Sequence, residues 1–178
     1  MGSILLVPGY QGSGEGHWQS LWEFSLPGAR KVEMPSWEWP VRGEWVEALD
    51  EAIGAALLET EEPPLLVGHS LGCLAIVHWA AAHQRPVRGA LLVVPADVER
   101  PDALEQLRSF APIPRRSLPF PAILAASTND PFLSLEQARA LALDWGAQLV
   151  GLGPCGHLNM ASGHGPWVRG EALLSELR

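Results

Sequence analysis

A short apolar run followed by a glycine-bounded turn, within residues 65–72, constrains the fold of this chain more than any other feature. Residues 65–67, Leu-Leu-Val, show no polar alternation, which predicts a strand buried on both faces. The next five residues, Gly-His-Ser-Leu-Gly, fit the pattern G-x-S-x-G of a sharp turn from strand to helix. We expect glycines at both ends because two chain segments cross closely there, and a Cβ atom would collide.

Residues 71–82 can continue from this turn as a helix, with its N–H groups and positive dipole end directed at the Ser70 oxygen. The pattern alone is weak evidence of chemistry. A glycine-bounded turn in which Ser70 is an ordinary helix N-cap explains it equally well. The interpretation of Ser70 as a nucleophile therefore depends on whether an acid and a histidine follow at suitable positions.

Length and composition predict a single domain, residues 1–178, with one core. Apolar residues make up 47% of the chain and charged residues 18%, which is typical of a compact globular protein rather than a disordered one. The net charge is −8, and Lys31 is the only lysine. This balance argues against nucleic acid and anionic membrane as partners, because both require basic patches.

The two cysteines, Cys73 and Cys155, form neither a disulfide framework nor the spacing of a zinc site. We expect both to be reduced thiols. The first residues do not combine a basic segment with a long apolar run, and no stretch approaches the ~18 apolar residues of a membrane span. These features predict a cytoplasmic protein.

Several further apolar runs predict strands that alternate with helices. Strands are expected at residues 3–7, 31–34, 65–67, 90–94, 121–126 and 147–152. Helices are expected at residues 17–22, 44–58, 71–82, 103–108 and 134–145, and around Leu173, Leu174 and Leu177. Alternation of apolar strands with helices predicts an α/β fold, with a doubly wound, mainly parallel sheet of about six strands flanked by helices.

Ser70, Asp130 and His157 each come directly after a predicted strand. In open α/β sheets, functional residues gather at the carboxyl ends of the strands. The chain order Ser, Asp, His is the one expected of α/β-hydrolases. His157 can take the Ser70 proton and return it to a leaving group, while Asp130 accepts the other imidazole N–H and fixes the tautomer. The three residues are therefore candidates for a catalytic triad.

Each of these assignments has an alternative. Asp130 precedes a proline, so a plain Asp-Pro turn residue also fits this position. Asp97 follows another strand and is a rival acid, and Asp102 is a weaker one. His17 either flanks the pocket or serves as a structural hydrogen-bonding group.

The glycine-rich loop after the first strand, residues 8–16, offers a second kind of site. Its spacing is not G-x-G-x-x-G and no G-K-[ST] follows, which argues against a nucleotide site. The alternative is an oxyanion hole, formed by backbone N–H groups of this loop and of the residue after the nucleophile. Tyr10 and Leu71 are the candidates, with Gln11 as the alternative to Tyr10.

The turn around Ser70, together with residues 128–132 and 155–159, resembles the small serine hydrolases related to retinoblastoma-binding protein nine. Residues 7–10, 17–19, 95–99 and 162–167 resemble the bacterial branch of this family, so that the resemblance covers nearly the whole chain. It implies a minimal α/β-hydrolase fold without a lid domain, and by position the same triad of Ser, Asp and His. The first loop lacks the multi-glycine form His-Gly-Gly-Gly, which leaves the choice between Tyr10 and Gln11 open.

Together, these features predict a serine hydrolase that cleaves a small carboxylic ester through an acyl-enzyme, with no cofactor and no metal. An amidase or aminopeptidase using the same triad is an alternative, and so is a non-catalytic binding protein on a hydrolase scaffold. Short loops predict a shallow pocket for a small acyl group, with Trp37 and Trp39 as candidate walls. The expected partner is a small ester or amide, not nucleic acid or membrane; the sequence identifies no protein partner.

Overall fold

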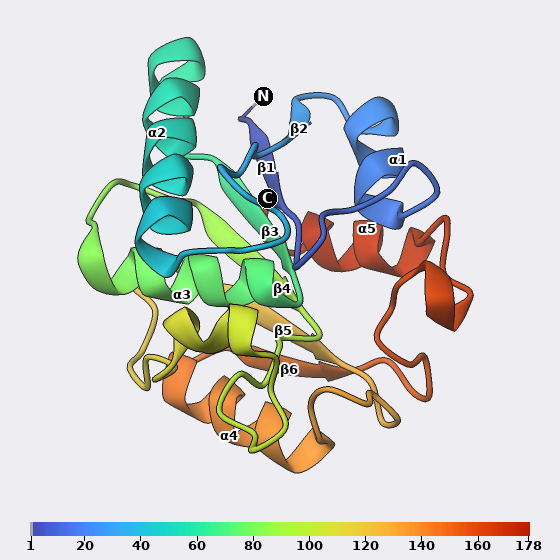
Figure 1. Cartoon of the computed structure of the whole chain (residues 1–178). Helices are drawn as coiled ribbons and strands as arrows, with labels where there is room; N and C mark the ends of the chain where they lie inside the picture. The colour runs from blue at the N-terminus through green and yellow to red at the C-terminus, as the bar shows by residue number, and fades with distance from the viewer. Residues whose placement is uncertain (1) are drawn as a thin grey trace.

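The computed structural model describes residues 2–178, which are built around one parallel β-sheet (Figure 1). Its strands are β1 (Ile4–Val7), β2 (Ala29–Lys31), β3 (Leu65–His69), β4 (Gly89–Val93), β5 (Ala122–Ala126) and β6 (Gln148–Gly151). They lie in the order β2-β1-β3-β4-β5-β6, and every neighbouring pair is parallel. The order reverses direction at β1, so the carboxyl ends of β1 and β3 border the crevice where α/β sheets bind ligands. The predicted doubly wound sheet is confirmed.

Helices cover both faces of the sheet (Figure 1). They are α1 (Trp18–Ser25), α2 (Arg42–Thr60), α3 (Leu71–Ala82), α4 (Leu135–Trp145) and α5 (Val168–Ser175), with the 3-10 helices η1 (Glu105–Phe110) and η2 (Met160–Ser162). The first face packs against α2, α3 and α4, and the second against α1 and α5. Among the described residues, no helix combines the length and the apolar character that a membrane crossing requires.

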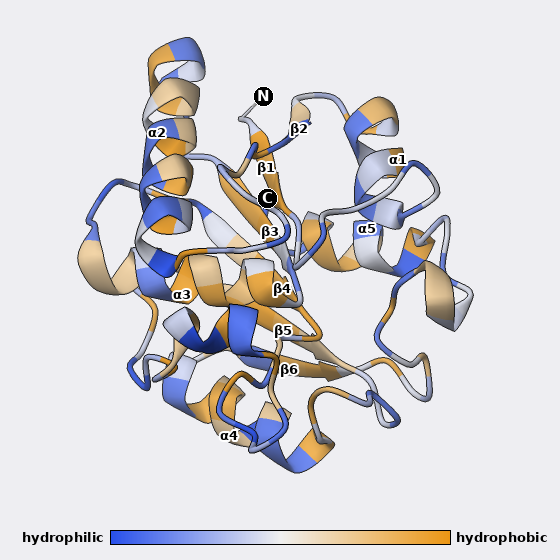
Figure 2. Ribbon diagram, viewed as in Figure 1, coloured by the Kyte–Doolittle hydropathy of each residue, from blue (hydrophilic) through white to orange (hydrophobic). Residues whose placement is uncertain are grey.

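Residues of the inner strands β1, β3, β4 and β5 alternate between two cores, which explains why these strands are largely apolar (Figure 2). In β1, Leu5 and Val7 join the core under α2, α3 and α4, while Ile4 and Leu6 join the core under α1 and α5. Complete burial of one such side chain contributes about 1.5–3 kcal/mol. The two cores together hold the sheet rigid, and the loops at its carboxyl edge are anchored to it.

Two predicted elements lie elsewhere than the sequence indicates. The edge strand β2 occupies Ala29–Lys31 instead of residues 31–34, because Gly28, with φ 77°, turns the chain into the sheet before the apolar residues begin. Val32 and Met34 are buried but follow the strand. The helix expected at residues 103–108 is a 3-10 helix at Glu105–Phe110.

Candidate active site

Ser70 lies at the sharp turn between β3 and α3, with φ 53° and ψ −117°. This backbone conformation is sparsely populated for a non-glycine residue and costs about 1–3 kcal/mol. A Cβ atom on Gly68 would lie 2.8 Å from the backbone N of Cys73, and one on Gly72 would lie 2.0 Å from the carbonyl oxygen of Val7. The close crossing that the sequence predicts at both glycines is therefore confirmed.

The structure brings the side chains of Ser70, Asp130 and His157 together. His157 Nε2 lies 2.8 Å from Ser70 Oγ, and His157 Nδ1 lies 2.9 and 3.1 Å from the two carboxylate oxygens of Asp130. The side chains of His157 and Asp130 are 8% and 1% exposed. Because a carboxylate only accepts hydrogen bonds, Nδ1 carries the proton, which leaves Nε2 to accept from the Ser70 hydroxyl.

Backbone N–H groups and small polar side chains hold the acid in place. The N–H of Phe132 donates to Asp130 Oδ1 at 2.9 Å. Asn129 Oδ1 accepts from Ser127 Oγ at 2.9 Å and from the N–H of Gly156 at 2.7 Å. These bonds tie the loop after β5 to the loop after β6, so that acid and histidine keep a fixed separation. Ser127 and Asn129 lie within three residues before Asp130, but no sequence pattern indicates that they hold it.

Two further histidines lie behind His157. His69 Nε2 lies 2.9 Å from the carbonyl oxygen of His157, to which it donates a hydrogen bond. The rings of His69 and His157 are 5.1 Å apart, and those of His17 and His69 are 4.7 Å apart. Burial, followed by the nearby His157 and Lys31, lowers the pKa of His17 from 6.5 to about 4, and burial also lowers the pKa of His69. Both are therefore neutral at pH 7.

The structure gives His17 a structural position. Its Nδ1 accepts a hydrogen bond of 3.2 Å from the N–H of Gln19, which caps the start of α1. Within residues 2–178, its Nε2 has no hydrogen-bond partner. His17 thus contacts the site through His69 and not through the cavity that borders Ser70. The only signal of His69 in the sequence is its place next to Ser70, which does not indicate this contact.

The rival acids contact other groups. Asp97 accepts hydrogen bonds from Gln137 Nε2 at 2.5 Å and from the N–H of Glu99 at 3.0 Å. Asp102 forms an ion pair with Arg100. Among the described residues, Asp130 is the acid that contacts the ring of His157.

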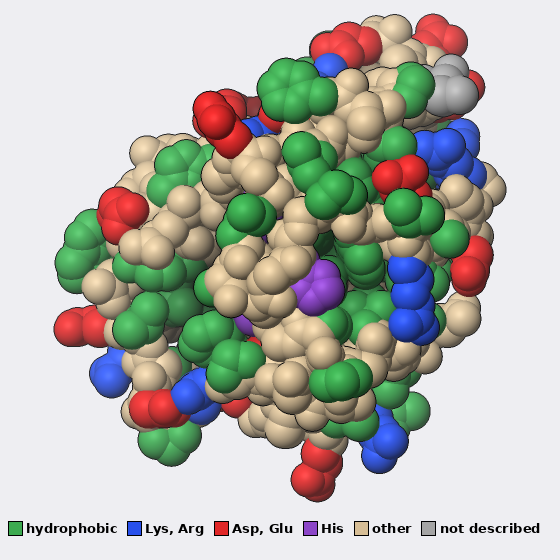
Figure 3. Space-filling model, turned by 90° about the vertical axis from the view of Figure 1, so that its right-hand side faces the viewer, with side chains coloured by type: hydrophobic (Ala, Val, Ile, Leu, Met, Phe, Trp, Pro, Cys, Tyr) green, Lys and Arg blue, Asp and Glu red, His purple; other side chains and the backbone are tan. Residues whose placement is uncertain are grey.

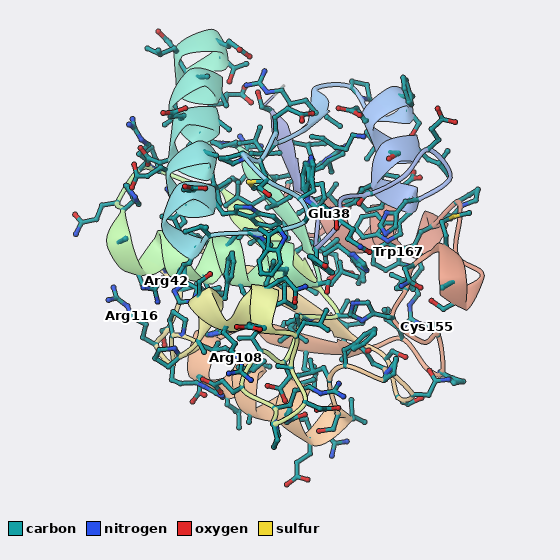
Figure 4. All side chains as sticks on the ribbon, viewed as in Figure 1. Glu38, Arg42, Arg108, Arg116, Cys155 and Trp167 are labelled. Carbon is teal, nitrogen blue, oxygen red and sulfur yellow. The ribbon has the colours of Figure 1, made fainter. Side chains whose placement is uncertain are left out.

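Both cysteines are free thiols. Cys73 is buried one helical turn after Ser70, and its Sγ donates to the carbonyl oxygen of Val93. Burial raises the pKa of this thiol, which makes it a packing residue rather than a nucleophile. Cys155, labelled in Figure 4, is half-buried on the loop after β6 and packs against the core under α1 and α5.

The backbone near Ser70 distinguishes the candidate oxyanion donors. The N–H of Gln11 donates to the carbonyl oxygen of Trp37 at 3.1 Å. The N–H of Tyr10 makes no hydrogen bond within the described residues. Leu71 is the first residue of α3, so its N–H lies outside the hydrogen-bond ladder of the helix. Tyr10 and Leu71 therefore retain free N–H groups next to the serine, whereas Gln11 does not.

A cavity of about 460 Å³ borders Ser70 and His157. Its wall comes mainly from residues 96–107, which follow β4 and extend into η1, and from Phe132. The cavity is larger than the shallow pocket that the short loops predict.

On the face that carries α1 and α5, acidic and basic side chains are dispersed among apolar ones rather than gathered into one charged patch (Figure 3).

The tryptophans predicted as candidate pocket walls lie elsewhere. Trp37 packs against Gly12 and against the ring of Trp45, whose centroid is 5.6 Å away. Trp39 is 62% exposed. Neither residue lines the cavity, because the loop that carries them turns away from Ser70 towards α2.

Comparison with known proteins agrees with this geometry. Residues 4–176 match the model of the family described as serine hydrolase. A YdeN-like hydrolase from Pectobacterium atrosepticum is 32% identical, with a TM-score of 0.85 over 98% of this chain and 89% of that one. The ydeN gene product from B. subtilis is 20% identical, with a TM-score of 0.77 over 99% of this chain and 98% of that one.

A more distant structure shares the fold alone. Est1E from Butyrivibrio proteoclasticus, in its structure with ferulic acid bound, is 12% identical with a TM-score of 0.70, over 99% of this chain and 86% of that one. The comparison with curated proteins gives no match. The match to the family model over nearly all of the sequence, and the 32% identity to a YdeN-like hydrolase, assign the chain. It belongs to the serine hydrolase family, within the α/β-hydrolase superfamily.

Proposed function

We propose that this hydrolase cleaves a carboxylic ester of a small molecule through an acyl-enzyme, with Ser70 as nucleophile, His157 as general base and Asp130 as the orienting acid. The observation that carries the proposal is the continuous hydrogen-bond chain from Ser70 Oγ through both ring nitrogens of His157 to the carboxylate of Asp130. A serine hydroxyl is a weak nucleophile at neutral pH and needs such a base within hydrogen-bond reach.

In the first half-reaction, Ser70 Oγ attacks the ester carbonyl carbon while its proton passes to His157 Nε2. Asp130 stabilises the imidazolium that forms. The carbonyl electron pair moves onto oxygen, and the free N–H groups of Tyr10 and Leu71 are the donors that would stabilise this oxyanion. The tetrahedral intermediate then collapses, His157 gives its proton to the departing alcohol, and the acyl group remains on Ser70.

In the second half-reaction, water occupies the place of the alcohol. His157 removes a proton from this water, whose oxygen attacks the acyl-enzyme carbonyl. Collapse of the second intermediate breaks the bond to Ser70 Oγ, which regains its proton from His157. The products are a carboxylic acid and an alcohol, and the free enzyme is restored.

The test is the intact mass of the protein after incubation with a fluorophosphonate, which labels an activated serine. We expect a single adduct on the parent, none on Ser70→Ala and much less on His157→Ala. Ser175→Ala is a matched control, because Ser175 is exposed on α5 and its hydroxyl donates to the carbonyl oxygen of Glu171. A folded parent without an adduct would contradict the proposal and favour a non-catalytic binding scaffold.

A second comparison separates an esterase from an amidase. Hydrolysis of p-nitrophenyl butyrate is measured beside that of butyryl p-nitroanilide, which presents the same acyl group on an amide. We expect the ester to react with the larger kcat/KM. A larger kcat/KM for the anilide would assign the same triad to an amidase.

A further inference from the structure

The cavity beside Ser70 has an apolar wall whose side chains are open to solvent. Leu104 and Phe132 are 50% and 47% exposed, and both line the cavity together with Ala103 and Leu107. Apolar side chains that face a cavity next to a nucleophile gain free energy when an apolar ligand removes them from water. The wall therefore suits a hydrocarbon chain rather than a polar group.

The guanidinium of Arg100, which also lines the cavity, donates hydrogen bonds to other groups of the protein. Its Nε and Nη2 donate to the two carboxylate oxygens of Asp102, each at 2.5 Å, and its Nη1 donates to the carbonyl oxygen of Pro131 at 2.8 Å. Its guanidinium carbon lies 5.9 Å from the centre of the Phe132 ring. Arg100 thus fastens the wall of residues 96–107 to the loop that carries Asp130.

The charges around the cavity disfavour an anionic substrate. Asp97 and Asp102 line it together with a single arginine, Arg100, whose charge is already paired. A carboxylate elsewhere on the substrate would find no unpaired cation in the cavity lining and would lie near two aspartates. The apolar wall and the acidic excess point to the same conclusion, which is a neutral chain.

We propose that this cavity binds the neutral hydrocarbon acyl chain of the ester, and that Arg100 sets the shape of the cavity. The inference rests on the proposed acyl-enzyme. The acyl group remains in the site through both half-reactions, joined to Ser70 between them, whereas the alcohol must leave and be replaced by water. A walled cavity therefore suits the acyl chain, and an open approach suits the alcohol.

The experiment measures kcat/KM for p-nitrophenyl esters from acetate to octanoate. We expect a rise of about fourfold for each added methylene until the cavity is filled. The mono-p-nitrophenyl ester of adipic acid has the length of the hexanoate but ends in a carboxylate, and we expect it to react at least tenfold more slowly. A preference for acetate, or for the adipate ester over the hexanoate, would overturn the proposal.

Variants of the wall test the location of the chain. Ala103→Trp narrows the cavity and Leu104→Ser removes apolar surface, and each should lower the ratio of octanoate to acetate kcat/KM at least tenfold. Leu58→Trp, at an exposed position of α2 outside the cavity, is the matched control and should leave this ratio unchanged. If neither wall variant changed the ratio, the chain would bind elsewhere and the proposal would fail.

A parallel series of butyrate esters with alcohols of increasing length separates the two sides of the ester. A steeper dependence on the alcohol than on the acyl chain would overturn the assignment of the cavity. Fluorophosphonate labelling of the same samples distinguishes the two proposals. An unlabelled, inactive parent contradicts the hydrolase proposal itself, whereas a labelled parent without dependence on chain length contradicts only the inference about the acyl chain.

Discussion

Two regions meet at Ser70 and differ in how they are held. The reaction region consists of residues 127–132 and 155–157, where Asp130 and His157 are buried and fixed by backbone N–H groups and small polar side chains. The wall region consists of residues 96–107, fixed at the surface by charged side chains. There Arg100 and Asp102 are 28% and 69% exposed. In the proposed enzyme, geometry for chemistry is thus built into the core, and geometry for substrate choice lies on the surface.

This difference has energetic consequences. A buried, hydrogen-bonded group that loses its partner cannot turn to water, so its replacement has a large effect. When an exposed ion pair is broken, water solvates the charges, so the pair contributes little to stability. Changes in the reaction region should therefore abolish activity, while changes in the wall should shift selectivity and leave the fold intact.

The sharpest comparison replaces one carboxylate in each region. Asp130→Asn keeps the size of the side chain but favours the wrong tautomer of His157, and we expect kcat to fall by about 10³- to 10⁴-fold. Asp97→Asn removes a carboxylate that accepts hydrogen bonds from Gln137 Nε2 and from the backbone N–H of Glu99, and we expect kcat to fall less than tenfold. Steady-state kinetics on one ester measures both. Equal losses would show that the two regions do not differ in the way proposed.

The turn around Ser70 provides the second comparison. A Cβ atom on Gly72 would lie 2.0 Å from the carbonyl oxygen of Val7, so Gly72→Ala should lower the free energy of unfolding by about 3 kcal/mol or more. Gly43, in the first turn of α2, has no atom within 4 Å of an added Cβ. Gly43→Ala should stabilise the protein by up to about 1 kcal/mol. Urea unfolding distinguishes them, and similar values for both would contradict the close crossing.

The third comparison concerns how stability depends on pH, in the parent and in a variant that lacks the His17 imidazole. The pKa of His17 falls from its ordinary 6.5 to about 4 in the folded protein, chiefly through burial. Between these values the unfolded chain binds more protons, so stability decreases as the pH is lowered from 6.5 towards 4. Each such histidine contributes a slope of up to about 1.4 kcal/mol per pH unit. Burial lowers the pKa of His69 as well, which adds to the loss in the same direction.

His17→Asn isolates the contribution of His17. Asparagine preserves an acceptor for the N–H of Gln19 at the start of α1 but does not titrate. Urea midpoints measured at intervals from pH 7 to pH 4 should decline less steeply in this variant than in the parent. Identical slopes would mean that His17 is not held neutral by the fold.

The sequence predicted the sheet and the residues around Ser70 because both depend on local patterns. Apolar runs of three to six residues locate the strands, and the carboxyl ends of parallel strands bring Ser70, Asp130 and His157 to one edge. The hydrogen bond from His69 to the carbonyl oxygen of His157 joins residues 88 positions apart. No local pattern encodes such a contact, which is why His69 escaped detection.

The wall could not be predicted for a related reason. Residues 99–119 are rich in proline and charge. Apart from the short helix expected at residues 103–108, they have no clear helical or strand period, so nothing in them indicates which side chains face Ser70. Trp37 and Trp39 were candidates on account of their size and their position after a strand. Their loop instead packs on α2, since Trp45 Nε1 donates to the carbonyl oxygen of Ser36. Only the tertiary arrangement makes Arg100 part of the cavity.

The smallest effect on stability is expected where selectivity changes most, at Arg100. Arg100→Met keeps the aliphatic stem but removes the bonds to Asp102 and Pro131, and the octanoate preference should fall. Because the ion pair is exposed, the urea midpoint should remain that of the parent, in low salt and in 1 M NaCl alike. Arg100→Lys, which cannot bind the carboxylate through two nitrogens, should lie between parent and Met variant in selectivity. A large loss of stability in Arg100→Met would instead make the wall part of the folding core, and the separation between chemistry in the core and substrate choice at the surface would no longer hold.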